Sequence, residues 1–289
     1  MKNSLVKTVG ILTSGGDAPG LNAAIRAIAR TAMDEYGMKV IGIHNGYRGL
    51  IDCEYEELKP FDITGILTRG GTILGTSREK PFKYTEENSK TGKNPVESIK
   101  QTYKKLALDA LVVLGGNGAN TTAHMLHQEG LNIIGLPKTI DNDLVGTDIT
   151  FGFYTAVSVA TEAIDRLHTT AHSHNRIMVI EVMGHKAGWL ALYAGIAGGG
   201  DVIIIPEIPY DVKIINKHLS KRKEEGKSFS IVVVAEGAKS LEEAKLDKKV
   251  LKHRRSEMKE SIGYRIAREL EKETGFVSRV TVLGYLQRG

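Results

Sequence analysis

The chain has 289 residues, of which 41% are hydrophobic and 25% charged, a composition typical of globular proteins rather than of disordered or fibrous chains. The formal net charge of +5 could suit nucleic acid, but 39 basic residues are interleaved with 34 acidic ones and aromatic residues make up only 6%, so we expect small anions as ligands instead. A single cysteine excludes an internal disulfide, and no apolar run approaches the roughly 18 residues of a membrane span, so we expect a cytoplasmic protein without nucleic-acid or membrane partners.

Short apolar runs alternate with helical segments along the whole chain. They are TVGILT at 8–13, KVIGIH at 39–44, ALVVLGG at 110–116, NIIGLP at 132–137, RIMVIEVM at 176–183, DVIIIPE at 201–207, SIVVVAEG at 230–237 and RVTVLGYL at 279–286. Nearly continuous hydrophobicity is typical of strands covered on both faces, and the alternation with helices favours mainly parallel sheets. We therefore predict an α/β fold, and the length suits two packed domains.

Three glycine-rich turns occur along the chain, two of them directly after these apolar runs. The first, GILTSGGDAPGLNAAIRA, carries Gly15 and Gly16 between a strand and a helix; the second, LTRGGTILGTSR, ends in Arg78; the third, LVVLGGNGAN, places Asn117 after a buried strand. Backbone amides and helix N-termini at such turns can face an anion, although each turn alone could be only a tight connection. Neither the Walker nor the dinucleotide pattern is present. Together the turns predict a polyphosphate site.

The stretch GLPKTIDNDLVGTD, residues 135–148, brings charge to the end of an apolar strand. Phosphoryl transfer needs a base near the incoming hydroxyl, a counter-charge on the transferred group and a cation, and Asp141, Lys138 and Asp143 could meet these needs. The alternative is a turn rich in Asp and Asn that only caps the following segment.

The segment 238–258, AKSLEEAKLDKKVLKHRRSEM, is densely charged and has few apolar residues. We expect an exposed insertion whose basic residues form a solvated surface rather than a nucleic-acid patch.

Five segments in order along the chain resemble the 6-phosphofructokinase family of bacterial type: LTSGGDAPGLNAAIR, RGGTILGTSR, PKTIDNDL, EVMGHKAGWLAL and VTVLGYLQRG. The resemblance implies two Rossmann-like three-layer domains with mainly parallel sheets and an active site in the cleft between them. It also implies transfer of a phosphoryl group, with Mg²⁺, to the 1-hydroxyl of fructose 6-phosphate, giving fructose 1,6-bisphosphate in glycolysis, usually by a homotetramer.

The resemblance divides the chain into two domains. Residues 1–152 with 263–289 would bind the phosphoryl donor, and residues 153–262 would bind the sugar phosphate. Relatives continue beyond the motif in which this chain stops at Gly289, so the first domain looks truncated.

The functional positions also carry over from the family. Asp141 would be the catalytic base, with Thr139, Lys138 and Gly15 beside it. Donor-binding positions would be Gly16, Tyr47, Arg78, Gly116, Asn117, Gly118 and Ala119. Sugar-phosphate positions would be Thr139, Asp141, Asp143, Arg176, Met183, Gly184, His185, Glu236, Arg279, Tyr285 and Arg288, with Arg176 supplied by a neighbouring subunit. Metal positions would be Asn117, Asp141 and Asp143. Arg26 and Arg30 match an effector-binding pair, but arginines on a helix surface can also serve only as solvated groups.

Several positions depart from the family pattern. Asn117 replaces an aspartate associated with magnesium, His185 replaces an arginine, and Tyr285 replaces a histidine. Within the family, glycine at position 118 accompanies ATP and aspartate accompanies pyrophosphate, whereas Lys138 is frequent in pyrophosphate-dependent members. We therefore expect ATP as co-substrate. A pyrophosphate-dependent phosphofructokinase and a non-catalytic, regulatory phosphofructokinase-like subunit are the alternatives.

Overall fold

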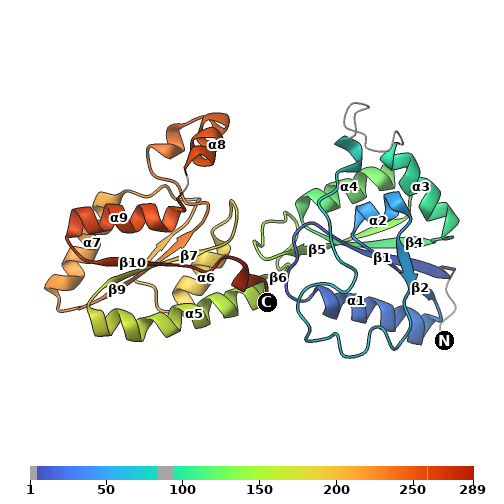
Figure 1. The fold of residues 1–289 in the computed structure, drawn as a ribbon, viewed down its shortest axis with the longest axis horizontal. Coiled ribbons are helices and arrows are strands. Elements are labelled where there is room, and N and C mark those ends of the chain that lie inside the picture. The colour runs from blue at the N-terminus through green and yellow to red at the C-terminus, as the bar shows by residue number, and fades with distance from the viewer. Residues whose placement is uncertain (1–4, 84–93, 259) are drawn as a thin grey trace. The chain divides into compact units, whose positions relative to one another are not determined.

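The structure, a computed structural model, describes residues 5–83, 94–258 and 260–289, which fall into two compact units (Figure 1). The first unit comprises the described residues as far as Thr139, together with 144–152 and Arg288. The second comprises 140–143, 153–287 and Gly289.

The first unit is built on a six-stranded sheet in the order β3-β2-β1-β4-β5-β6. Its strands are β1 (Thr8–Ser14), β2 (Lys39–Ile43), β3 (Tyr55–Glu57), β4 (Ala110–Gly115), β5 (Ile133–Thr139) and β6 (Phe151–Gly152). Among these paired strands, only the short β3 runs antiparallel to its neighbour. The helical segments are α1 (Leu21–Arg30), η1 (Thr31–Glu35), α2 (Tyr47–Asp52), η2 (Pro81–Lys83), α3 (Pro95–Lys105) and α4 (Asn117–Gln128).

Alternate residues of the central strands pack against opposite helical layers, as the two-residue period of a strand requires. Ile11 belongs to the core under α1, whereas its neighbour Leu12 belongs to the core under α2, α3 and α4. Helix starts follow local chemistry: α3 begins after Asn94, whose side chain accepts a hydrogen bond from the Val96 amide, with Pro95 in the first turn.

The second unit has a four-stranded parallel sheet in the order β10-β7-β9-β8. Its strands are β7 (Ile177–Val182), β8 (Val202–Ile204), β9 (Ser230–Ala235) and β10 (Ser278–Val282). Helices α5 (Phe153–His174) and α6 (Trp189–Ala197) cover one face, and α7 (Val212–Glu224) and α9 (Ile262–Thr274) cover the other (Figure 1). The remaining segments are η4 (Glu243–Lys245), α8 (Lys248–Glu257) and η5 (Gly284–Arg288).

The predicted fold class is confirmed, because each unit is a mainly parallel sheet between helical layers. The assignment of residues 263–289 to the first domain needs correction. Strand β10 pairs along its whole length with β7, so α9 and β10 complete the second unit, and only Arg288 of this segment groups with the first.

The segment 238–258 contains α8, and none of the ten residues of this helix is buried. Within the described parts of the chain, no helix is both long enough and apolar enough to cross a membrane.

Candidate active site

The carboxyl ends of β1, β4 and β5 meet at one edge of the first sheet. Ser14 is in register with Gly115, and Gly115 with Pro137. Three loops therefore leave adjacent strand ends: the turn at Gly15 and Gly16, the turn at Gly116, and the acidic loop, which follows Lys138 and Thr139 at the end of β5. Open α/β sheets bind ligands at this edge.

Hydrogen bonds join the first two glycine-rich loops. The Gly15 amide donates to the Ser77 carbonyl over 2.9 Å, and the Thr76 hydroxyl donates to the Gly15 carbonyl over 2.7 Å. Gly15 has a φ of 95°, a left-handed conformation that favours glycine. Arg78 follows Ser77 with its side chain exposed, so the structure brings this predicted donor residue next to the Gly15 turn.

The third loop leads directly into the N-terminus of α4. Gly116 is the N-cap and has no side chain to occupy the first amides of the helix, and Asn117 and Gly118 are exposed. No described atom lies within 4 Å of a Cβ built on Gly118, so a side chain there would enter open space. Unoccupied amides with the positive end of the helix dipole suit a phosphate group.

Lys138 connects the acidic loop to the first glycine turn. Its side chain is buried, and its ammonium group donates a hydrogen bond to the Gly16 carbonyl. A Cβ built on Gly15 would lie 3.5 Å from the Lys138 Nζ. Because burying an ammonium group is costly unless it is partnered, this contact fixes a positive charge beside the turn.

Tyr47, a predicted donor-binding residue, lies in the core of the first unit. It is fully buried, and its hydroxyl donates to the Ala119 carbonyl over 2.8 Å. Burial raises the pKa of Tyr47 well above its usual value. The side chain therefore supports the first turn of α4 from within the core, and its role at the donor pocket stays a prediction.

Arg288 also lies at the first glycine turn. Its Nη1 is 2.9 Å from the Asp17 Oδ1, and a Cβ built on Gly16 would lie 2.8 Å from the same Nη1. A larger side chain at position 16 would therefore collide with this guanidinium group. Asp17 is a residue of this turn that the sequence-based predictions missed. Its position directly after Gly15 and Gly16 is the signal in the sequence that could have indicated it.

In the second unit, the ends of β7 and β9 bring together four predicted sugar-phosphate residues. The Met183 amide donates to the Gln287 Oε1 over 3.2 Å, and the His185 amide donates to the Glu236 Oε1 over 2.8 Å. Gly184 lies between them with a φ of 137°. The His185 side chain is exposed, so it can reach a ligand.

The other predicted residues of the second unit are more dispersed. Arg279 lies on β10 and donates to the Ser278 carbonyl, Tyr285 is largely exposed in η5, and Arg176 is half-buried just before β7. Asp141 is half-buried and Asp143 exposed.

Asn142 separates these two acids and takes a φ of 51°, so the acidic loop turns sharply between them. Thr139 ends β5, and its carbonyl accepts a hydrogen bond from the Thr150 hydroxyl.

Two of the predicted metal positions, Asp141 and Asp143, lie in the acidic loop, and the predicted effector positions lie on α1. Among the residues that the structure describes, no three or more His, Cys, Asp or Glu side chains are grouped so that they could hold a metal ion by themselves. Mg²⁺ nevertheless needs only one or two carboxylates when water and substrate phosphates complete its shell, so the oxygen donors of Asp141 and Asp143 fit this ion. Of the suggested effector pair on α1, Arg30 forms an ion pair with Asp34, while Arg26 is half-buried.

These features define a class: a doubly wound α/β protein with glycine turns and a helix N-terminus arranged to bind phosphate at the strand ends. The chain belongs to the phosphofructokinase family, because the model of the family described as Phosphofructokinase matches residues 8–289.

Sequence relatives and a solved structure show which members of the family the chain is similar to. It is 63% identical over 292 residues to the ATP-dependent 6-phosphofructokinase of Spirochaeta thermophila, covering 100% of this chain and 80% of the relative. It is 53% identical to the ATP-dependent 6-phosphofructokinase 3 of Bacteroides thetaiotaomicron, covering 97% and 78%. A solved phosphofructokinase structure from Saccharomyces cerevisiae matches with a TM-score of 0.84 and 32% identity, covering 98% of this chain but only 38% of the yeast chain.

Proposed function

We propose that the chain transfers the γ-phosphoryl group of ATP to the 1-hydroxyl of fructose 6-phosphate, giving fructose 1,6-bisphosphate in glycolysis. The observation that carries this proposal is the buried ammonium group of Lys138 at the Gly16 turn, three residues before Asp141. Relatives at 63% and 53% identity are named ATP-dependent 6-phosphofructokinases, which supports both the reaction and the donor.

The first unit holds the donor in this proposal. The amides at Gly16, Gly116 and Gly118 face the phosphate oxygens, and Arg78 adds a planar cation that suits them. Lys138 offsets the negative charge of the transferred group. Asp141 accepts the proton from the sugar hydroxyl as that oxygen attacks phosphorus.

Mg²⁺ is proposed as the cofactor. Carboxylate oxygens of Asp141 and Asp143 would hold it, with the amide oxygen of Asn117 as a weaker donor. When bound, the ion supplies positive charge to the phosphate oxygens.

The second unit holds the sugar phosphate. Glu236 accepts hydrogen bonds from sugar hydroxyls, while Met183, Gly184 and His185 form the adjacent wall. Arg279 and Tyr285 supply a cation and a hydroxyl for the sugar phosphate. Arg176 would reach the same group from a neighbouring subunit, so we propose a cytoplasmic homo-oligomer, a tetramer, as the working form.

Gly118 supports ATP over pyrophosphate. Open space surrounds the position where its side chain would begin, and a carboxylate there would occupy that space and repel an α-phosphate.

The test measures initial rates with fructose 6-phosphate and Mg²⁺, using either ATP or pyrophosphate as donor, on the purified full-length protein. We expect fructose 1,6-bisphosphate with ATP and at most trace product with pyrophosphate. Turnover with pyrophosphate alone would exclude the ATP assignment. Binding of both substrates without turnover would identify a regulatory subunit instead.

A further inference from the structure

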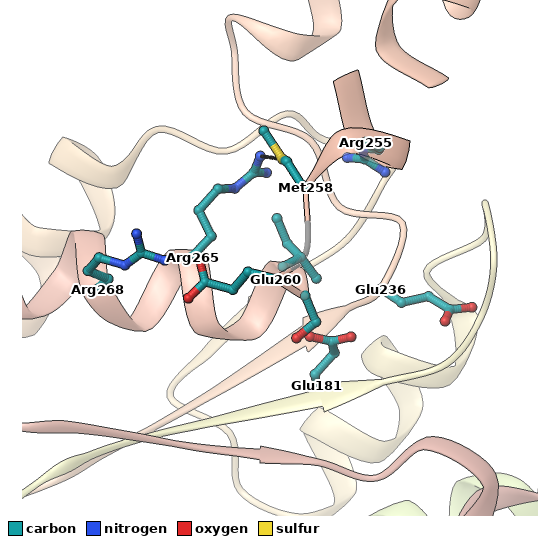
Figure 2. A pocket seen from close by; sticks show the side chains of 9 residues that line it. Glu181, Glu236, Arg255, Met258, Glu260, Arg265 and Arg268 are labelled. Atoms are coloured by element: carbon teal, nitrogen blue, oxygen red, sulfur yellow. Dashed lines mark hydrogen bonds and ion pairs between the residues drawn. The ribbon is translucent and has the colours of Figure 1, made fainter. Parts of the chain in front are cut away.

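A cavity of about 530 Å³ opens at the start of α9 in the second unit (Figure 2). The guanidinium groups of its three arginines all have carboxylate partners: Arg255 and Arg265 pair with Glu243, and Arg268 pairs with Glu260. These cations therefore serve the fold. The side chain that bears most directly on phosphate binding lies instead in the first unit, in the first turn of α4.

Asn120 lies four residues after the N-cap of α4, and its side chain turns back towards the loop that precedes the helix. Its Nδ2 donates to the Gly115 carbonyl over 2.6 Å and to the Gly116 carbonyl over 3.3 Å. Gly115 ends β4, and Gly116 is the N-cap. One side-chain amide therefore holds the two consecutive peptide groups through which the chain passes from strand to helix.

These two peptide groups could otherwise rotate at little cost, because glycine adopts more backbone conformations than other residues. Both peptides are trans, so each carbonyl and the N–H that follows it point in opposite directions. By holding the carbonyls of Gly115 and Gly116, Asn120 directs the amides of Gly116 and Asn117 away from itself. A rotated peptide would present a carbonyl oxygen there, and its partial negative charge repels phosphate.

Two glycines of the sheet make room for this turn of the helix. A Cβ built on Gly135 of β5 would lie 2.4 Å from the Asn120 Oδ1, and a Cβ built on Gly115 would lie 2.2 Å from the Ala119 Cβ. The Asn120 side chain therefore packs against the body of β5, before that strand ends at Thr139. Amides directed away from Asn120 face the carboxyl edge of the sheet, where the phosphate site is proposed.

An asparagine suits this double contact better than a hydroxyl residue. Thr121 and Thr122, the next two residues of α4, each donate to the carbonyl four positions earlier, over 2.9 and 3.1 Å. A hydroxyl has one hydrogen to donate, whereas the Asn120 amide has two and reaches both glycine carbonyls. Its Oδ1 is buried without a hydrogen-bond partner among the residues that the structure describes. Because an unpaired buried acceptor lowers stability, this residue favours a functional explanation.

We propose that Asn120 is a positioning residue for the phosphoryl donor, which locks the peptide groups between Gly115 and Asn117 so that their amides face the donor phosphates. This role rests on the function proposed above, because it assumes that the donor binds at this turn. Without the lock, only a fraction of the molecules present both amides, and the apparent affinity for the donor falls by that fraction. Bound donor restores the geometry, so turnover at saturation changes little.

The test compares Asn120→Ala with the parent, both as the full-length protein. Equilibrium titration with the imido analogue of ATP and Mg²⁺ measures donor affinity without turnover, and steady-state rates give the Michaelis constants. Loss of two hydrogen bonds should weaken analogue binding about tenfold and raise the Michaelis constant for ATP to match. Turnover at saturating ATP and the Michaelis constant for fructose 6-phosphate should stay within about twofold.

Two further variants separate positioning from stability. Asn94→Ala removes the N-cap of α3, which accepts from the Val96 amide over 2.9 Å, so it should lower the melting temperature at least as much as Asn120→Ala but leave analogue affinity unchanged. Asn120→Ser keeps a hydroxyl that can donate to the Gly116 carbonyl, as the two threonines after it do to theirs. This variant should recover part of the affinity and bind the analogue about threefold more weakly than the parent.

Unchanged analogue affinity in Asn120→Ala, an equal loss in Asn94→Ala, or no recovery in Asn120→Ser would each overturn the positioning role. If the parent turns over ATP normally while Asn120→Ala keeps its affinity, the proposed reaction stands and this role is rejected. Weaker analogue binding by Asn120→Ala in a protein without turnover would reject the proposed reaction but keep the positioning role.

Discussion

The ammonium group of Lys138 donates a hydrogen bond to the backbone carbonyl of Gly16, a residue 122 positions earlier in the chain. The contact ties the end of β5 to the turn after β1. It makes the conformation of the first glycine turn depend on a residue of the acidic loop, so one substitution should affect both stability and phosphoryl transfer.

Lys138→Met tests this dependence. The Gly16 carbonyl loses its donor, so we expect the free energy of unfolding to fall by about 1–3 kcal/mol. Turnover should also fall, because the positive charge beside the donor is lost. Denaturant unfolding and steady-state rates measure the two effects. Lys100→Met, at a surface ion pair with Glu129, should cost less than about 1 kcal/mol and leave turnover intact. Normal turnover of the Lys138→Met variant would show that this lysine takes no part in phosphoryl transfer.

Asp141→Asn tests the catalytic base. The amide keeps the shape of the side chain but cannot accept the proton, so the turnover number should fall by about 10²–10⁴-fold while the dissociation constant for fructose 6-phosphate stays nearly constant. Rapid-quench kinetics and equilibrium binding provide the two values. Asp148→Asn, an exposed acid of the same loop, is the control and should retain its rate. A base role is excluded if both variants turn over equally fast.

Gly118→Asp tests donor selection, with Gly118→Ala as the matched control. Since a Cβ at this position meets no described atom within 4 Å, both variants should fold with a melting temperature close to that of the parent. The carboxylate should raise the Michaelis constant for ATP by at least about tenfold, equivalent to 1.4 kcal/mol, while the methyl group has little effect. Unchanged ATP kinetics in Gly118→Asp would show that the donor does not pass near this position.

Glu243 provides a pH-dependent contribution to stability. Its side chain is only 1% exposed and pairs with Arg265 and Arg255. Burial alone would raise the pKa of this carboxyl, but hydrogen bonds from Arg265 and from the Ser240 amide outweigh burial and lower the pKa to about 2. Because the folded pKa lies below the ordinary value of 4.5, the stabilisation is complete above that pH and is lost as the pH falls towards 2.

Glu243→Gln should therefore reduce the free energy of unfolding by about 1–3 kcal/mol at neutral pH, because it leaves two half-buried guanidinium groups without their anion. The difference from the parent should shrink between pH 4.5 and pH 2. Urea unfolding across this range measures it. Glu162→Gln, in an exposed pair with Arg166, should show no comparable trend, and a constant deficit in Glu243→Gln would contradict the assigned pKa.

The strands and the fold class could be predicted because long β-branched runs have few other stable arrangements. The sheet to which the last run belongs could not be predicted, since the apolar residues of VTVL do not specify which strand is their neighbour. Its pairing with β7 depends on how α9 packs, which the strand's own residues do not encode.

The site was only partly accessible from sequence for the same reason. Strand ends indicated where Lys138 and the glycine turns would gather. The pair between Asp17 and Arg288 joins residues 271 positions apart, and the burial of Tyr47 depends on its hydroxyl reaching Ala119. Neither contact leaves a local pattern.

The late position of β10 has a consequence for synthesis on the ribosome. All six described strands of the first sheet have been synthesised once residue 152 has emerged, whereas β7 has no neighbour on one side until residues 278–282 follow more than 90 positions later. During that interval the edge of β7, buried on both faces in the finished fold, is open to pairing with other nascent chains. We expect the second unit, and not the first unit, to need protection by chaperones.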